Sequence, residues 1–174
     1  MLALIAIPLA SCGNHKTQSD IIEVKDSVKK PAIPQKMQEY KSSRTITWQG
    51  GTYTYSIHRQ VDIKLPVVTD DNGNKFYDNS IDLTVTRNGS TFFSQTFTKE
   101  TFSPYLDEGF KKKGILEGLV FDKAGNGYMQ FAASVSYPQT DEYIPLVVKL
   151  SSDGSISISR DTKMDSGSDV DTLE

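Results

Sequence analysis

A length of 174 residues, with 37% hydrophobic and 24% charged side chains, is typical of one globular domain with tails. The net charge of −3 argues against a nucleic-acid-binding protein, because such proteins present a basic surface to the phosphates. The single cysteine has no partner for a disulfide within the chain, so we expect stability to come from a packed core.

Residues 1–11 are predicted to be a lipoprotein signal peptide. The apolar run Met1–Leu9 is followed by Ala10, Ser11 and Cys12, and it is too short for a membrane-spanning helix, which needs roughly 20 apolar residues. The run lacks the basic start of a usual signal. The pattern resembles the bacterial lipobox, which implies that Cys12 carries lipid and becomes the mature N-terminus. The alternative is a buried cysteine at the end of an ordinary helix.

The chain divides into a tether, one domain and a tail. Residues 12–43 and 162–174 are polar, with few large apolar groups, and such segments bury too little surface to offset the entropy of ordering. We therefore expect a flexible tether at 12–43, a single β-rich domain at 44–161 and a disordered tail at 162–174.

Within 44–161 apolar residues recur at every second position, which indicates strands with one buried face. The clearest stripes are Tyr53–Tyr55–Ile57, continued by Val61–Ile63–Leu65, then Ile81–Leu83–Val85, Met129–Phe131–Ala133–Val135–Tyr137 and Ile156–Ile158. Gly50-Gly51 and Asn88-Gly89 favour two-residue hairpin turns. The pattern predicts an all-β fold, an antiparallel meander of about eight or nine strands that forms a sandwich or a barrel.

One segment favours a short helix at about 104–113. Ser103 and Pro104 suit an N-cap and the first helical position, and Lys111–Lys113 suit the negative end of the helix dipole. Gly114 would then supply a left-handed residue after the helix.

Three stretches, 75–79, 114–123 and 131–146, are similar to an uncharacterised lipoprotein family of Bacteroidetes-type bacteria, a domain of unknown function. The resemblance covers roughly residues 48–161 and implies a location in the cell envelope, with no activity to carry over. In such bacteria, surface-exposed lipoproteins often carry an acidic export signal just after the cysteine. Residues 13–17 contain no acidic pair, so the resemblance implies an outer-membrane anchor facing the periplasm, with surface exposure as the alternative. Motifs of the type that these bacteria O-glycosylate occur at Ser27 and Thr172.

The sequence indicates no catalytic, cofactor or metal-binding residue. There are two histidines, and His58, the only one in the predicted domain, lies on the polar side of a strand. There is no Gly-x-Ser-x-Gly motif to present a nucleophile. The stretch 70–74 is rich in Asp and Asn, but Ile81 stands where an EF-hand needs glutamate, and a hairpin turn explains the same residues.

Two other features keep alternative functions open. Glycosidases need only two carboxylates, and the candidates are Asp107, Glu108, Glu117, Asp122, Asp141 and Glu142. Aromatic residues around the predicted helix could fill the core or line a pocket in a barrel.

We expect a non-enzymatic, membrane-anchored binding or accessory module with an unknown protein or small-ligand partner. The alternatives are a lipocalin-like carrier of an apolar ligand and a carboxylate-dependent glycan hydrolase.

Overall fold

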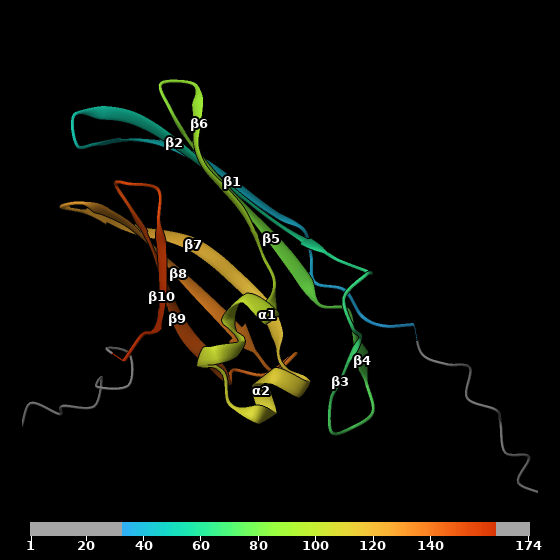
Figure 1. Cartoon of the computed structure of the whole chain (residues 1–174). Coiled ribbons are helices and arrows are strands. Elements are labelled where there is room, and N and C mark those ends of the chain that lie inside the picture. Colours follow the sequence, from blue (N-terminus) through green and yellow to red (C-terminus); the bar gives the residue numbers. More distant parts are fainter. Residues whose placement is uncertain (1–32, 163–174) are drawn as a thin grey trace, which may run out of the picture. The chain divides into compact units, whose positions relative to one another are not determined.

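The computed structural model describes residues 33–162, which form two four-stranded antiparallel sheets facing each other (Figure 1). The predicted signal peptide, Cys12, Ser27, Thr172 and most of the predicted tail and tether lie outside the described residues. The all-β prediction is confirmed, and of its two forms the sandwich is observed, because the described strands form no closed barrel.

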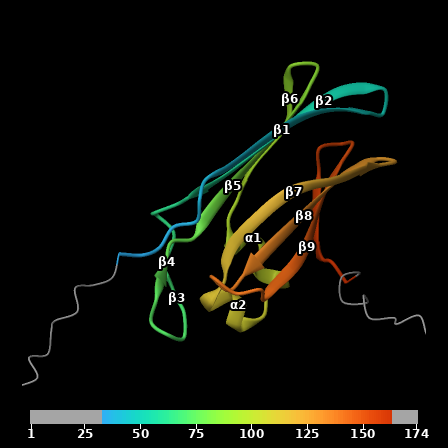
Figure 2. The same ribbon diagram turned by 180° about the vertical axis from the view of Figure 1, so that it is seen from behind.

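The first sheet has the order β1-β2-β5-β6, and the second has the order β10-β9-β8-β7. A separate two-stranded sheet is formed by β3 and β4. The strands are β1 (Tyr40–Trp48), β2 (Gly51–Val61), β3 (Val68–Thr69), β4 (Lys75–Phe76), β5 (Asn79–Arg87), β6 (Ser90–Phe97), β7 (Ile115–Gly125), β8 (Tyr128–Ser136), β9 (Tyr143–Ser151) and β10 (Ile156–Arg160). Figure 2 shows from behind how β5 and β7 approach each other along one side of the sandwich.

The apolar stripes face inward as predicted. Tyr53, Tyr55 and Ile57 of β2 are buried, as are alternate residues of β5 and β8. In β2 and β5 the inward side chains alternate with more exposed polar ones, which is the pattern of a sheet with one solvated face. The aromatic rings belong to this core. Phe131, for example, makes edge contacts with Tyr55 and Phe121, at 6.0 and 5.7 Å between ring centroids.

Two local predictions need correction. The turn between β1 and β2 consists of Gln49 and Gly50, which both have positive φ, and Gly51 already pairs with Trp48. The predicted continuation of β2 is wrong, because the strand ends at Val61 and Ile63 lies in a loop. By contrast, Asn88 and Gly89 form the predicted hairpin turn with φ of 50° and 83°.

The helical connection between the sheets is more broken than predicted. It comprises α1 (Lys99–Phe102), a 3-10 turn η1 (Ser103–Tyr105) and α2 (Glu108–Lys113). The break occurs because Leu106 and Asp107 are extended, which buries Leu106 in the core. Asp107, rather than Ser103, therefore precedes α2.

Gly114 does not take the predicted left-handed conformation, since its φ is −79°. Glycine is needed there for another reason. A Cβ atom would lie 2.6 Å from the carbonyl oxygen of Phe110 and 2.9 Å from Cγ1 of Val135. The tight approach of α2 to β8 thus depends on the missing side chain.

The domain begins earlier than residue 44, the predicted start. β1 starts at Tyr40, and Gln35 forms a parallel bridge to Phe76 of β4. This small sheet is held to the sandwich by a second apolar cluster of Val68, Phe76 and Ile115, with Met37 packed against it.

Candidate functional site

Three pockets of the described surface surround residues 137–142, the loop between β8 and β9. These adjoining pockets have volumes of about 260, 290 and 300 Å³ and share residues of this loop, and Thr140 lines all three. We call this surface the 137–142 groove. Its other walls come from the segment 35–37, from β4, from the β3–β4 turn and from the start of β7.

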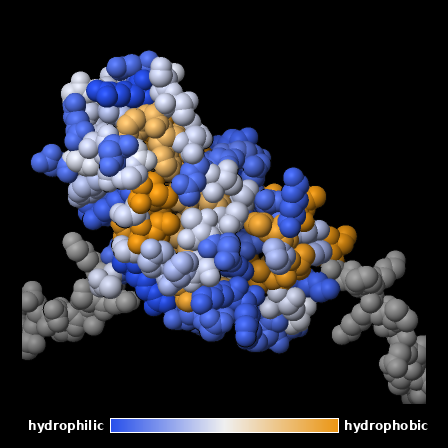
Figure 3. All heavy atoms as spheres, viewed as in Figure 1, coloured by the Kyte–Doolittle hydropathy of each residue, from blue (hydrophilic) through white to orange (hydrophobic). Residues whose placement is uncertain are grey.

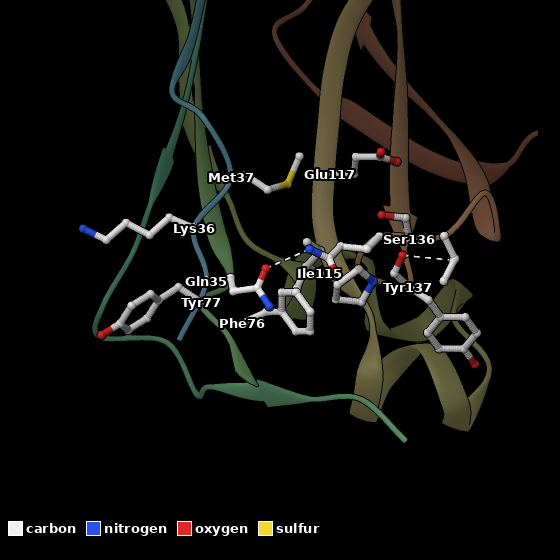
Figure 4. Close-up of a pocket in the computed structure, with 12 residues that line it drawn as sticks. Gln35, Lys36, Met37, Phe76, Tyr77, Ile115, Glu117, Ser136 and Tyr137 are labelled. Carbon is white, nitrogen blue, oxygen red and sulfur yellow. Dashed lines mark hydrogen bonds between the residues drawn. The ribbon is translucent and has the colours of Figure 1, made fainter. Parts of the chain in front are cut away.

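The first pocket lies between elements of opposite sides of the sandwich (Figure 4). Gln35 and Phe76 approach from the first-sheet side, and Glu117 and Ser136 come from β7 and β8. Across the pocket the amide of Gln139 donates to the amide oxygen of Gln35 at 2.7 Å. The pocket therefore offers amide, hydroxyl and carboxylate groups above an apolar floor.

The loop itself is held by short-range hydrogen bonds. The backbone N–H of Tyr137 donates to the carbonyl of Glu142 at 3.0 Å, and the hydroxyl of Thr140 donates to the carbonyl of Tyr137 at 3.1 Å. Gln139 has a φ of 60°, which is uncommon for a residue with a side chain. Such strained positions are concentrated at functional sites in proteins.

Helix α2 fixes the aromatic wall of the groove. The ring of Tyr137 stacks on Phe110 with 4.1 Å between centroids. Gly109 leaves the space that the hydroxyl of Tyr137 occupies, since a Cβ at this position would overlap it. The position of Tyr137 thus depends on two residues of α2.

The second pocket carries the charged residues of the β3–β4 turn. Lys113 pairs with Asp71, and this hydrogen bond raises the pKa of Lys113. The carboxylate of Asp70 accepts the backbone N–H groups of Asn72 and Asn74 at 2.9 and 2.8 Å. The side-chain amide of Asn74 also donates to it and is the main cause of its lowered pKa. The carboxylate thus organises the turn between β3 and β4.

Beside the groove, a buried polar seam joins the two sheets. Asp78 accepts the backbone N–H groups of Asn79 and Leu116, both at 2.8 Å, and lies 3.4 Å from the ammonium group of Lys99. Asn79 donates to the carbonyl of Leu116 at 2.8 Å, and Lys99 donates to that of Gly114 at 2.7 Å. Side chains therefore supply the hydrogen bonds that a neighbouring strand would give to this edge of β7.

Arg59 of β2 extends the seam. Its guanidinium group donates to the carbonyl oxygens of Glu117 and Gln38. Burial lowers the pKa of Arg59, while the nearby charge of Glu117 raises it. An arginine remains charged at such a site, because its ordinary pKa lies far above neutral pH. The seam thus holds the groove wall at Glu117 against the first sheet.

Most of the candidate catalytic residues named from the sequence lie apart from one another in the structure. His58 lies on the outer face of the first sheet, where its ring nitrogen is 2.6 Å from Glu39. Asp107 pairs with Arg160, and Glu108 pairs with Lys111 on α2. The candidates that reach the groove are Glu117, Asp141 and Glu142.

The sequence did not single out the uncharged residues of the groove. Gln35 lies in the predicted tether, and its bridge to β4 spans a long stretch of chain. The sequence feature that could have indicated the groove is the loop at 137–142, where Pro138 separates Tyr137 from the polar run Gln139–Glu142.

Within residues 33–162, no three side chains of the metal-binding types His, Cys, Asp and Glu come together as a potential metal site. In the same part of the chain, no helix has the length and hydrophobicity to cross a membrane.

The chain is thus an all-β sandwich with an open groove at one end. It belongs to the family described as a domain of unknown function, DUF4738, whose model matches residues 20–158. The match begins inside the segment that the sequence predicts to be a tether. No curated protein matches the chain.

Proposed function

We propose that this protein is a lipid-anchored, non-enzymatic binding module of the bacterial cell envelope, held by Cys12 on the periplasmic side of the outer membrane. The single observation that carries the binding role is the 137–142 groove. The anchor rests on the lipobox pattern that ends at Cys12.

The ligand that suits the groove best is an extended segment of a partner protein. Each of the three pockets has no more than about 300 Å³, which is at or below the lower limit for sites that enclose small molecules. They adjoin one another on the surface, so an extended chain can occupy them in succession. Amide and hydroxyl groups such as those of Gln35, Gln139 and Thr140 can pair with backbone groups of the partner, and the ring of Tyr137 offers apolar contact.

A lipocalin-like carrier is a weaker proposal. Such a carrier needs a closed barrel around an apolar cavity, whereas the described strands form two open sheets. Residues that could have lined the cavity, including Phe97 and Phe102, are fully buried and stack on each other at 5.8 Å.

A glycan hydrolase is the second candidate, because Glu117 and Asp141 line the same pocket. Glycosidases use two such carboxylates on either side of the scissile bond. The variants Glu117→Gln and Asp141→Asn provide the test. A hydrolase would lose turnover of envelope glycans in both variants, whereas a binding module has no such turnover in the parent protein.

Site-specific photocrosslinking in the native envelope tests the binding role. A photoreactive amino acid replaces Thr140 in the groove or, as a matched control, Asn88 at the exposed hairpin turn between β5 and β6. We expect a discrete protein adduct from position 140 and none from position 88. Equal labelling from both positions, or no adduct from position 140 in correctly anchored protein, would contradict the proposal.

A further inference from the structure

We propose that the domain rests on the membrane through an exposed apolar corner made of Ile33, Ile63 and Val67. Their exposed fractions are 82%, 73% and 43%. This inference rests on the lipid anchor proposed at Cys12, and it adds a direct contact between the folded domain and the lipid surface.

The three residues belong to one small part of the fold. β4 is flanked on one side by β3, which follows Val67, and on the other by Gln35, two positions after Ile33. The loop that carries Ile63 joins β2 to β3, and the backbone N–H of Asp62 donates to the carbonyl of Asp78, just beyond β4, at 3.1 Å. Figure 3 shows apolar surface (orange) close to the place where the described chain begins.

None of the three side chains serves the core. Both apolar clusters are complete without them, and the second cluster is filled by Val68, Phe76, Ile115 and Met37. Single exposed aliphatic residues are common on proteins. Here Val67 precedes the strand on one side of β4 and Ile33 precedes the segment on the other, so exposed aliphatic residues flank β4 where the described chain starts.

The position of the chain start identifies the membrane as the partner of these residues. Residues 13–32 link Cys12 to the corner, and a chain of that length reaches at most roughly 70 Å. A lipidated Cys12 therefore keeps the corner within that distance of the bilayer, and the corner is the part of the domain to which the linker is attached. Aliphatic side chains that enter the headgroup region stabilise such a contact, and two-point attachment is stronger than either contact alone.

The lysine side chains around the corner suit a lipid surface. Lys36, Lys64 and Lys75 are exposed around it, and long basic side chains can place their charge among headgroups while their stems remain on apolar surface. The nearest acidic residue in the sequence is Asp62, whose carboxylate accepts the backbone N–H of Lys64 at 3.0 Å. Further along, Glu100, Lys111 and Lys112 line a cavity of about 200 Å³ together with Val67. Glu39 and the turn residues Asp70 and Asp71 also lie within a few positions of the corner, so the apolar lysine stems, rather than a net positive charge, are what suits a lipid surface.

Depth-dependent quenching tests the contact in the full chain, lipidated at Cys12 and reconstituted in vesicles of phosphatidylethanolamine and phosphatidylglycerol. With Cys12 blocked by lipid, Ile63→Cys carries an environment-sensitive dye. The matched control is Val120→Cys, because Val120 is a 47% exposed aliphatic residue on β7. We expect nitroxide-labelled lipids to quench the dye at position 63 several-fold more than at position 120.

A second variant distinguishes direct contact of the corner with lipid from mere nearness of the domain to the bilayer. Val67→Asp should reduce quenching at position 63 several-fold, whereas Val120→Asp should leave it unchanged. Equal quenching at positions 63 and 120 overturns the inference. So does a dye at position 63 that is shielded equally with and without vesicles, because residues 20–32 would then cover the corner. Palmitate labelling of the same samples reports on the anchor, so a missing anchor is distinguishable from a missing contact.

Discussion

The carboxylate of Asp78 accepts the backbone N–H of Leu116 at 2.8 Å, and this hydrogen bond joins the start of β5 in one sheet to β7 in the other. Leu116 lies at the free edge of its sheet, where no neighbouring strand supplies an acceptor. The same carboxylate attracts Lys99, which in turn binds the carbonyl of Gly114. One buried side chain thus positions the beginning of β7, from which the groove residues Ile115 and Glu117 extend.

Asp78→Ala should destabilise the fold by about 3 kcal/mol, because it leaves the mostly buried ammonium group of Lys99 without a counter-charge and the buried N–H of Leu116 without an acceptor. Urea denaturation followed by tryptophan fluorescence measures the change. Glu108→Gln is the control, since it removes an exposed carboxylate whose pair with Lys111 contributes little. Equal stability of the two variants would show that the seam does not hold the sheets together.

Phe131→Ala should cost about 3–5 kcal/mol of stability, the usual loss for removing a buried aromatic ring. Phe131 is fully buried between Tyr55 and Phe121. Val120→Ala, on the exposed side of β7, should change the unfolding free energy by less than about 0.5 kcal/mol. A small loss for Phe131→Ala would mean that the space between the sheets is loosely filled, as in a ligand carrier.

Gly109→Ala should displace the ring of Tyr137 and weaken crosslinking from position 140, because the new methyl group takes the space of the tyrosine hydroxyl. The fold should survive, since the tyrosine ring is at the surface of the groove. Crosslink yield and thermal unfolding are measured on the same samples. Unchanged yield with a displaced ring, seen in the NMR spectrum of Tyr137, would remove this residue from the binding surface.

The carboxylate of Glu39 should titrate below its usual pKa of 4.5, because Lys41 and then His58 donate hydrogen bonds to its charged form. A group with a lowered pKa stabilises the fold above its ordinary pKa and loses this contribution as the pH falls through the lowered value. Lys41→Ala should move the midpoint upward toward 4.5 in a carboxyl-detected NMR titration. An unchanged midpoint would show that the pair is not formed in solution.

The sheet strands could be predicted because each one is encoded locally. Tyr53, Tyr55 and Ile57 alternate with polar residues, and burial of one face follows directly from that period. The closed or open form of the sheets was not predictable from alternation, since both forms bury one face. The break in the helical connection at Leu106 was also not predictable from the local sequence. Leu106 is extended there because this conformation buries its side chain in the core, and a continuous helix would not.

The groove and the seam could not be predicted, because their parts are far apart in sequence. Gln35 meets Gln139, and Arg59 meets Glu117, only after the two sheets have packed. No local period marks such pairs. Asp78 and Lys99 were equally inconspicuous, since a single aspartate before a strand and a lysine after a threonine are common on protein surfaces.

Metabolic labelling with a palmitate analogue tests most directly whether a lipid on Cys12 attaches this β-sandwich to the envelope. The parent chain should incorporate the label and sediment with the membrane fraction, whereas Cys12→Ala should do neither while the domain remains folded. Labelling of Cys12→Ala at the level of the parent chain would contradict the lipid anchor and, with it, the proposed placement of the groove in the cell envelope.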